Sequence, residues 1–94
     1  MRLLITPLAE QDLEEIGDHI AQDNPKRAAS FVLELQAQCQ KICINPAGYR
    51  LRTDLSDGLR SCAHGNYVIF FESSDDQVTI IRVLHGARDL PELL

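Results

Sequence analysis

The order of hydrophobic and polar positions divides the chain into a helical first half and a sheet-forming second half. Residues 2–5 are a short apolar run that ends at Thr6-Pro7. A threonine cap followed by proline favours a helix start, so the pattern predicts a short strand and then a helix. Apolar positions next recur along one helical stripe, at Ala9, Leu13, Ile16, Gly17 and Ile20. The solvated face is assigned to Glu10, Glu14, Glu15 and Asp18.

A second helix is predicted after Asp23-Asn24-Pro25, where Asn24 caps and Pro25 occupies the first turn. Its apolar stripe ends at Asn45-Pro46-Ala47-Gly48 and comprises Ala28, Phe31, Val32, Leu35, Cys39, Ile42 and Cys43. The short connection indicates that the two helices form a hairpin, with the stripe of the second helix packed on a sheet.

Strands are predicted from the alternating and β-branched residues that follow, near 49–52 and over 59–64, 67–72 and 78–84. Gly65-Asn66 is a two-residue hairpin turn, and Ser73-Ser74-Asp75-Asp76 is a tight polar loop. The expected fold class is α+β: an N-terminal strand, a helical hairpin, then a C-terminal antiparallel three-stranded meander.

The turns set a register for this meander. With Gly65-Asn66 as the turn of the first hairpin, His64 opposes Tyr67, Cys62 opposes Ile69 and Arg60 opposes Phe71. With the four-residue loop in the second hairpin, Arg82 opposes Tyr67 and Val78 opposes Phe71. On this register Arg60 and Arg82 share an open face with Ile69, Phe71 and Ile80. The face given to the helices carries Val68, Phe70, Ile81 and Val83. A slip of one residue in the second hairpin would move Arg82 to the other side.

Length and charge narrow the class of protein. A chain of 94 residues, 45% of them hydrophobic, fits a single domain over 1–94. The net charge of -5 opposes direct, sequence-specific nucleic-acid binding by the chain alone, and association with anionic membranes. The first apolar run is too short for a secretion signal or membrane span, so a cytoplasmic location is expected. The three cysteines are then reduced thiols.

The arginine face is the first candidate binding site. An arginine on a central strand keeps its guanidinium hydrated, paired or in contact with a ligand, because isolated burial is too costly. One interpretation is an internal ion pair of Arg82 with Asp89 or Glu72; the other is an anionic or protein ligand. The final leucines, Leu90, Leu93 and Leu94, either close the core or contact a partner.

The spacing of the cysteine, histidine, serine and glycine residues does not favour a metal site or covalent catalysis. Cys39 and Cys43 lie on an apolar stripe, and no Cys-x-x-Cys pair accompanies Cys62, His64 and His85, so no zinc site and no cofactor are expected. There is neither a Gly-x-Ser-x-Gly elbow nor a phosphate-cradling glycine cluster. His85, where the last strand ends, is the one titrating group placed for proton transfer.

Several segments resemble, in order and spacing, the ParE toxins of the RelE/ParE superfamily. They are Thr6-Pro7-Leu8-Ala9 leading into Asp12-Leu13-Glu14-Glu15-Ile16, Gly58-Leu59-Arg60-Ser61, Tyr67-Val68-Ile69-Phe70-Phe71, and Val78-Thr79-Ile80-Ile81-Arg82-Val83-Leu84-His85-Gly86-Ala87-Arg88-Asp89. The resemblance spans nearly the whole chain. It implies a helical hairpin against an antiparallel sheet, in agreement with the pattern above.

The resemblance also implies a function: a non-enzymatic toxin of a type II toxin–antitoxin module. Such toxins inhibit DNA gyrase by stabilising its cleaved-DNA complex, and a ParD-like antitoxin neutralises them in a hetero-oligomer. The expected target-binding residues are Arg60, Arg82, His85 and Arg88. The expected antitoxin-binding residues, on the hairpin and the apolar sheet face, are Leu13, Ile16, Ile20, Ile69, Phe71 and Ile80.

Two other functions stay open. The first is that of the related RelE branch, in which the same fold cuts mRNA on the ribosome. Arg60 and Arg82 match positions of functional arginines in that branch. Its lysines and its C-terminal catalytic tyrosine have no match in this sequence. In that reading His85 transfers protons. The acidity of the chain motivates the last alternative, a degenerate toxin that acts mainly as an antitoxin-binding co-regulator.

Overall fold

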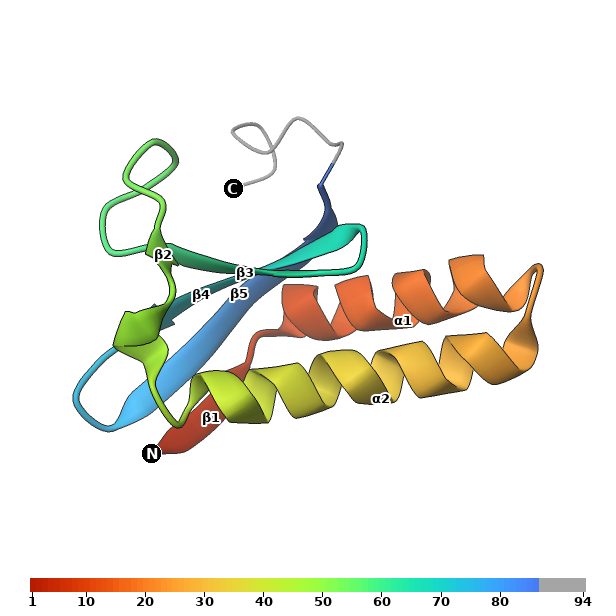
Figure 1. The fold of residues 1–94 in the computed structure, drawn as a ribbon, viewed down its shortest axis with the longest axis horizontal. Helices are drawn as coiled ribbons and strands as arrows, with labels where there is room; N and C mark the ends of the chain where they lie inside the picture. The colour runs from red at the N-terminus through yellow and green to blue at the C-terminus, as the bar shows by residue number, and fades with distance from the viewer. Residues whose placement is uncertain (87–94) are drawn as a thin grey trace.

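The computed structural model describes residues 1–86 and places a helical hairpin against one face of a mixed sheet (Figure 1). The helices are α1 (Pro7–Ala21) and α2 (Pro25–Ile42), followed by a 3-10 turn at Pro46–Gly48. The strands are β1 (Arg2–Ile5), β2 (Arg50–Leu51), β3 (Arg60–His64), β4 (Tyr67–Ser73) and β5 (Gln77–His85). The predicted α+β class and order of elements are confirmed.

The sheet has five strands in the order β1-β5-β4-β3-β2. β1 is the parallel member, pairing Arg2 with Gln77 and Ile5 with Ile80. The other pairs are antiparallel, so the predicted meander of β3, β4 and β5 forms the centre. The first and last strands of the described chain therefore lie side by side.

Local chemistry explains where the helices begin. The Thr6 hydroxyl oxygen accepts from the Ala9 N–H at 3.1 Å and donates to the Ile81 carbonyl at 3.0 Å. The Asn24 side chain accepts from the Arg27 N–H at 3.1 Å. Both caps are the predicted ones, and each precedes a proline at the first helical position. Thr6 does more than cap, because its second hydrogen bond ties the start of α1 to β5.

The β3–β4 hairpin has the register that the Gly65-Asn66 turn predicts. His64 opposes Tyr67, Cys62 opposes Ile69 and Arg60 opposes Phe71. Gly65 has φ +58°, a conformation that a residue without a Cβ adopts at little cost. This part of the sequence-based register is confirmed.

The register of the β4–β5 hairpin is different from the prediction. His85, not Arg82, opposes Tyr67, and Ile80, not Val78, opposes Phe71. β4 extends to Ser73, which shortens the loop, and a bulge between Phe70 and Phe71 shifts the pairing so that Arg82 opposes Phe70. A bulge leaves one residue unpaired and changes the side-chain alternation, which explains the altered position of Arg82.

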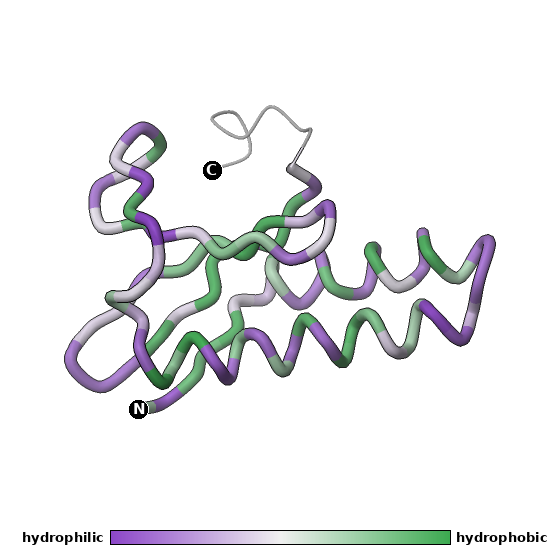
Figure 2. Tube along the Cα trace, in the orientation of Figure 1, coloured by the Kyte–Doolittle hydropathy of each residue, from purple (hydrophilic) through white to green (hydrophobic). Residues whose placement is uncertain are grey.

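The predicted assignment of the sheet faces is wrong for the same strands except at Val83, which packs beneath the helices as predicted. Ile69, Phe71 and Ile80 are fully buried and belong to the cluster beneath the helices, not to an open face. That cluster also contains Ala9, Leu13, Ile16, Phe31, Leu35, Cys39, Ile42, Cys62, Val78 and Val83. Figure 2 shows hydrophobic positions alternating with hydrophilic ones along both helices, as this one-sided packing requires.

The opposite face of the sheet holds a smaller cluster of Leu59, Phe70 and Leu84. Leu55, Val68 and Ile81 pack against it. The Arg52 guanidinium lies over the Phe70 ring at 5.8 Å, where a cation interacts favourably with the π face. Both faces of β4 are thus apolar, which is why alternation alone does not tell which one the helices cover.

Candidate functional site

Arg82 is held by α1 in a bidentate ion pair. Its Nε donates to Asp12 Oδ2 at 2.7 Å and its Nη2 donates to Asp12 Oδ1 at 2.9 Å. Asp12 Oδ2 also accepts from the backbone N–H of Val83 at 2.9 Å. The pKa of Arg82 is raised, mainly by the hydrogen bond to Asp12. Of the two sequence-based interpretations, an internal ion pair is found, and its carboxylate is that of Asp12. Asp89, one of the two predicted partners, lies outside the described residues.

Arg60 is bound to the backbone of the segment before β2. Its Nη1 donates to the Tyr49 carbonyl at 2.7 Å and, at 3.5 Å, to that of Ala47. It lies opposite Phe71, whereas Arg82 lies opposite Phe70 across the bulge. An open face on which the two arginines surround Ile69, Phe71 and Ile80 is therefore not formed.

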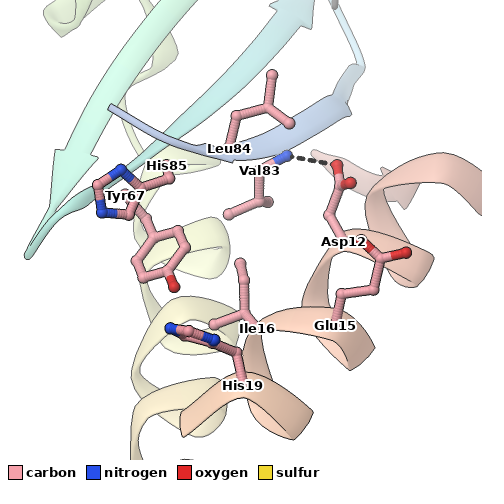
Figure 3. A pocket seen from close by; sticks show the side chains of 8 residues that line it. All are labelled: Asp12, Glu15, Ile16, His19, Tyr67, Val83, Leu84 and His85. Atoms are coloured by element: carbon pink, nitrogen blue, oxygen red, sulfur yellow. Dashed lines mark hydrogen bonds between the residues drawn. The ribbon is translucent and has the colours of Figure 1, made fainter. Parts of the chain in front are cut away.

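His85 lines a pocket of about 310 Å³ between α1 and the end of β5 (Figure 3). Its ring meets Tyr67 edge to face, with centroids 5.3 Å apart. The other lining residues are Asp12, Glu15, Ile16, His19, Val83 and Leu84. His85, one predicted target residue, thus lines the same pocket as Asp12, the carboxylate that binds Arg82, another predicted target residue.

The predicted antitoxin-binding residues are mostly internal. Ile69, Phe71 and Ile80 have no exposed surface, and Leu13 and Ile16 are each 6% exposed. Ile20 is half-buried. The helices cover the sheet face that carries Ile69, Phe71 and Ile80, so these side chains form no open surface. Contact of the six predicted residues with an antitoxin stays a prediction. Arg88 and Asp89 lie outside the described residues, as do Leu90, Leu93 and Leu94.

A groove along the helical hairpin was missed by the sequence analysis. This hairpin groove has a volume of about 780 Å³ and is lined by Ile5, Glu10, Leu13, Glu14, Gly17, Asp18, Ala28, Ala29, Val32, Leu33 and Gln36. Leu33, one of these lining residues, is 65% exposed. The sequence signal was present in Leu33 and in the small residues Gly17, Ala28 and Ala29, which let the two helices and any occupant approach closely.

A polar cluster joins α2 to the β3–β4 hairpin. Glu34 pairs with Arg27 through its Oε2, and its Oε1 lies 3.2 Å from His64 Nε2. The pKa of Glu34 is lowered, first by its hydrogen bond to Arg27 and then by that to His64. Phe31 stacks between them, 5.0 Å below the Arg27 guanidinium and 5.5 Å from the His64 ring. His64 therefore serves in a structural contact between the layers.

The cysteines are free thiols placed mainly in the core. Cys39 and Cys62 are buried and Cys43 is half-buried. Burial raises the pKa of Cys39 to about 11 and also raises that of Cys62. Within residues 1–86 no group of three or more His, Cys, Asp or Glu side chains is arranged to hold a metal ion. None of the helices described is long and apolar enough to cross a bilayer.

Comparison with known proteins identifies relatives over most of the chain. Residues 3–90 match the family described as the ParE toxin of the type II toxin–antitoxin system parDE. A protein named Toxin ParE1 from Caulobacter vibrioides is 36% identical over 78 residues, which cover 82% of this chain and 80% of the relative. Toxin ParE1 from Mycobacterium tuberculosis is 28% identical over 91 residues, or 95% of this chain and 93% of that one.

Two of the solved structures with this fold belong to toxin–antitoxin systems. The chromosomal ParDE system from P. aeruginosa matches with a TM-score of 0.77 and 22% identity, covering 90% of this chain and 95% of that one. The toxin–antitoxin complex RelBE2 from Mycobacterium tuberculosis matches with a TM-score of 0.62 and 23% identity, covering 89% and 95%. At these identities the likeness establishes the shared fold alone.

Proposed function

We infer the function of this chain from its family: the chain belongs to the ParE toxins of type II toxin–antitoxin systems. We propose that it inhibits DNA gyrase by stabilising the cleaved-DNA complex, and that a ParD-like antitoxin neutralises it. The observation that carries the proposal is the family match over residues 3–90, which includes the helical hairpin and all described strands except Arg2, the first residue of β1.

The charge of the chain agrees with a protein target. A net charge of -5 repels the phosphate backbone of free nucleic acid, so contact with DNA alone is unfavourable. A complex of gyrase and DNA offers protein surface as well. The His85 pocket is our candidate contact with the target, since it combines imidazole and phenol groups with an apolar floor of Ile16 and Val83.

Arg82 has a supporting role in this proposal. Its guanidinium is bound by Asp12 on two atoms, and this pair fixes the α1 wall of the pocket relative to β5. Contact of Arg82 with a phosphate, as the ribonuclease alternative requires, would have to compete with that ion pair.

A supercoiling assay with purified gyrase tests the target. We expect the chain, free of antitoxin, to block supercoiling and to accumulate cleaved DNA, and we expect His85→Ala to weaken this effect while its melting temperature stays near that of the parent. Unaffected gyrase together with cleavage of ribosome-bound mRNA would favour the endoribonuclease. No growth arrest on expression without antitoxin would favour the co-regulator.

A further inference from the structure

The His85 pocket has two chemically different walls above an apolar floor (Figure 3). Ile16 and Val83 form the floor. Figure 3 shows the ring of Tyr67 on the same side as His85 and the carboxylate of Glu15 on the opposite side. The volume of about 310 Å³ lies at the lower limit of pockets that bind small molecules, roughly 300 Å³. The pocket therefore has room for one side chain and not for a helix.

The carboxylate wall carries more negative charge than its internal partner compensates. Asp12 lines the pocket, but its charge is matched by Arg82, which binds it at two atoms. Glu15 is exposed and accepts a hydrogen bond from the neutral side chain of Gln11 at 3.2 Å. Within the part of the chain that the structure describes, Glu15 forms no ion pair. One negative charge therefore remains on this wall.

The aromatic wall is held in place before any ligand arrives. The Tyr67 ring meets the His85 ring edge to face and lies 5.6 Å from the Phe31 ring, measured between centroids. Phe31 belongs to the buried cluster beneath the helices, so it connects Tyr67 to the core. A wall that is already ordered loses little conformational freedom on binding. An aromatic ring opposite a carboxylate is a favourable environment for a cation, because both groups attract positive charge.

These features select a cationic group on an apolar stem. An anion would be repelled by Glu15, and an apolar ligand would cover this carboxylate without giving it a partner. Within residues 1–86 no group of three or more His, Cys, Asp or Glu side chains is arranged to hold a metal ion. Arginine meets each condition. Its planar guanidinium pairs with carboxylates and stacks on aromatic rings, and its methylene stem covers apolar surface.

We propose that the His85 pocket binds a single arginine side chain of gyrase, with the guanidinium between Glu15 and Tyr67. The methylene stem of this arginine lies on Ile16 and Val83. The identity of the partner rests on the proposed function, whereas the chemistry of the pocket does not. Glu15 thereby becomes a contact residue for the target, in addition to His85.

Two small probes test the chemistry of the pocket without gyrase. They are Nα-acetylarginine amide and Nα-acetylcitrulline amide, which have nearly the same shape but differ in charge. In an NMR titration we expect the arginine probe to bind about fivefold more tightly than the citrulline probe. Its amide shifts should centre on Glu15, Ile16 and Val83. Equal binding of the two probes, or shifts that avoid these residues, would overturn the inference.

Two neighbouring glutamates provide a matched pair of variants. Glu15→Gln removes the charge and keeps an acceptor for Gln11, so we expect the two probes to bind this variant within about twofold of each other. Glu14→Gln makes the same change one residue earlier, in the hairpin groove on the other flank of α1, and should keep the preference for arginine. Both positions are exposed, and both variants should melt near the parent temperature. An equal loss of preference in both variants would mean that only the overall charge matters, which also overturns the inference.

A supercoiling assay separates this inference from the proposed function. We expect half-inhibition of gyrase to require about fivefold more Glu15→Gln than parent, and no more Glu14→Gln than parent. Inhibition by Glu15→Gln at the concentration of the parent would overturn the pocket as the arginine site and leave the toxin function intact. If the parent does not inhibit gyrase, the proposed function fails and gyrase is excluded as the source of the arginine. The probe titration then still decides whether the pocket binds a guanidinium group.

Discussion

Asp12 and Arg82 are 70 positions apart in the sequence, and their side chains form a two-point ion pair at 2.7 and 2.9 Å. Asp12 is 5% exposed, and its carboxylate accepts a third hydrogen bond, from the Val83 N–H, beside the two from Arg82. This one carboxylate joins α1 to the bulged part of β5 and completes the α1 wall of the His85 pocket.

Asp12→Ala should therefore be strongly destabilising. It leaves the Arg82 guanidinium without its carboxylate and the buried Val83 N–H without an acceptor, at a cost of about 3–5 kcal/mol in unfolding free energy. Chemical denaturation measures this. Asp12→Asn, which keeps an acceptor for Val83, should lose less, and exposed Glu14→Ala should stay within about 0.5 kcal/mol of the parent. Equal stability of Asp12→Ala and Glu14→Ala would contradict the structural role.

Thr6→Ala should cost more than an ordinary cap. The substitution removes the acceptor for the Ala9 N–H and also the bond to the Ile81 carbonyl. We expect a loss of about 1–2 kcal/mol, at the upper end for a cap residue. Thr6→Ser keeps the hydroxyl and should recover most of the loss in thermal or denaturant unfolding. A serine variant as unstable as the alanine variant would show that the methyl group, not the hydroxyl, matters.

The Glu34 cluster predicts a defined pH dependence. Because the pKa of Glu34 is lowered in the folded chain, its ionised form contributes stability above the pKa of the unfolded chain, and this contribution is lost as the pH falls through the lower folded value. The difference in melting temperature between the parent and Glu34→Gln should be largest near neutral pH and shrink below about pH 4. Glu72→Gln, at an exposed position of β4, serves as control. A difference that grows with acidification would contradict this assignment.

Native thiol labelling should distinguish the three cysteines. With a pKa of about 11, Cys39 has only about one thiolate in a thousand at pH 8, and the thiolate is the reactive form. Iodoacetamide should therefore modify half-buried Cys43 first, while Cys39 and Cys62 react slowly, as peptide mass spectrometry would detect. In denaturant all three should react alike. Rapid modification of Cys39 in the native chain would place it outside the core.

Much of the fold follows from local signals in the sequence. Thr6-Pro7 and Asn24-Pro25 mark the starts of both helices, and Gly65-Asn66 fixes the β3–β4 register, because each acts over a few residues. Asp12 also carried a usable signal. It lies three residues after Ala9 and four before Ile16, so it is on the apolar stripe of α1, where a carboxylate requires a buried donor.

The faces of the sheet did not follow from the sequence because two ambiguities coincide there. β4 has apolar residues on both sides, so Ile69 and Phe71 fit a core no better than Val68 and Phe70 by pattern alone. The bulge then displaces Arg82 by one position relative to Phe70, and no glycine or proline marks it. The hairpin groove escaped detection since it depends on how two helices pack, not on either stripe separately.

The parallel pairing of β1 with β5 joins strands from opposite ends of the described chain, which matters while the protein is being translated. β5 is the strand on which β1 depends for its hydrogen bonds, and Arg82 is the partner that Asp12 needs in the same late segment. While a nascent chain lacks residues 77–85, the helical hairpin has neither a completed sheet beneath it nor its ion pair. A translation product truncated before β5 would consequently lack the strand that pairs with β1 and β4 and the arginine that binds Asp12.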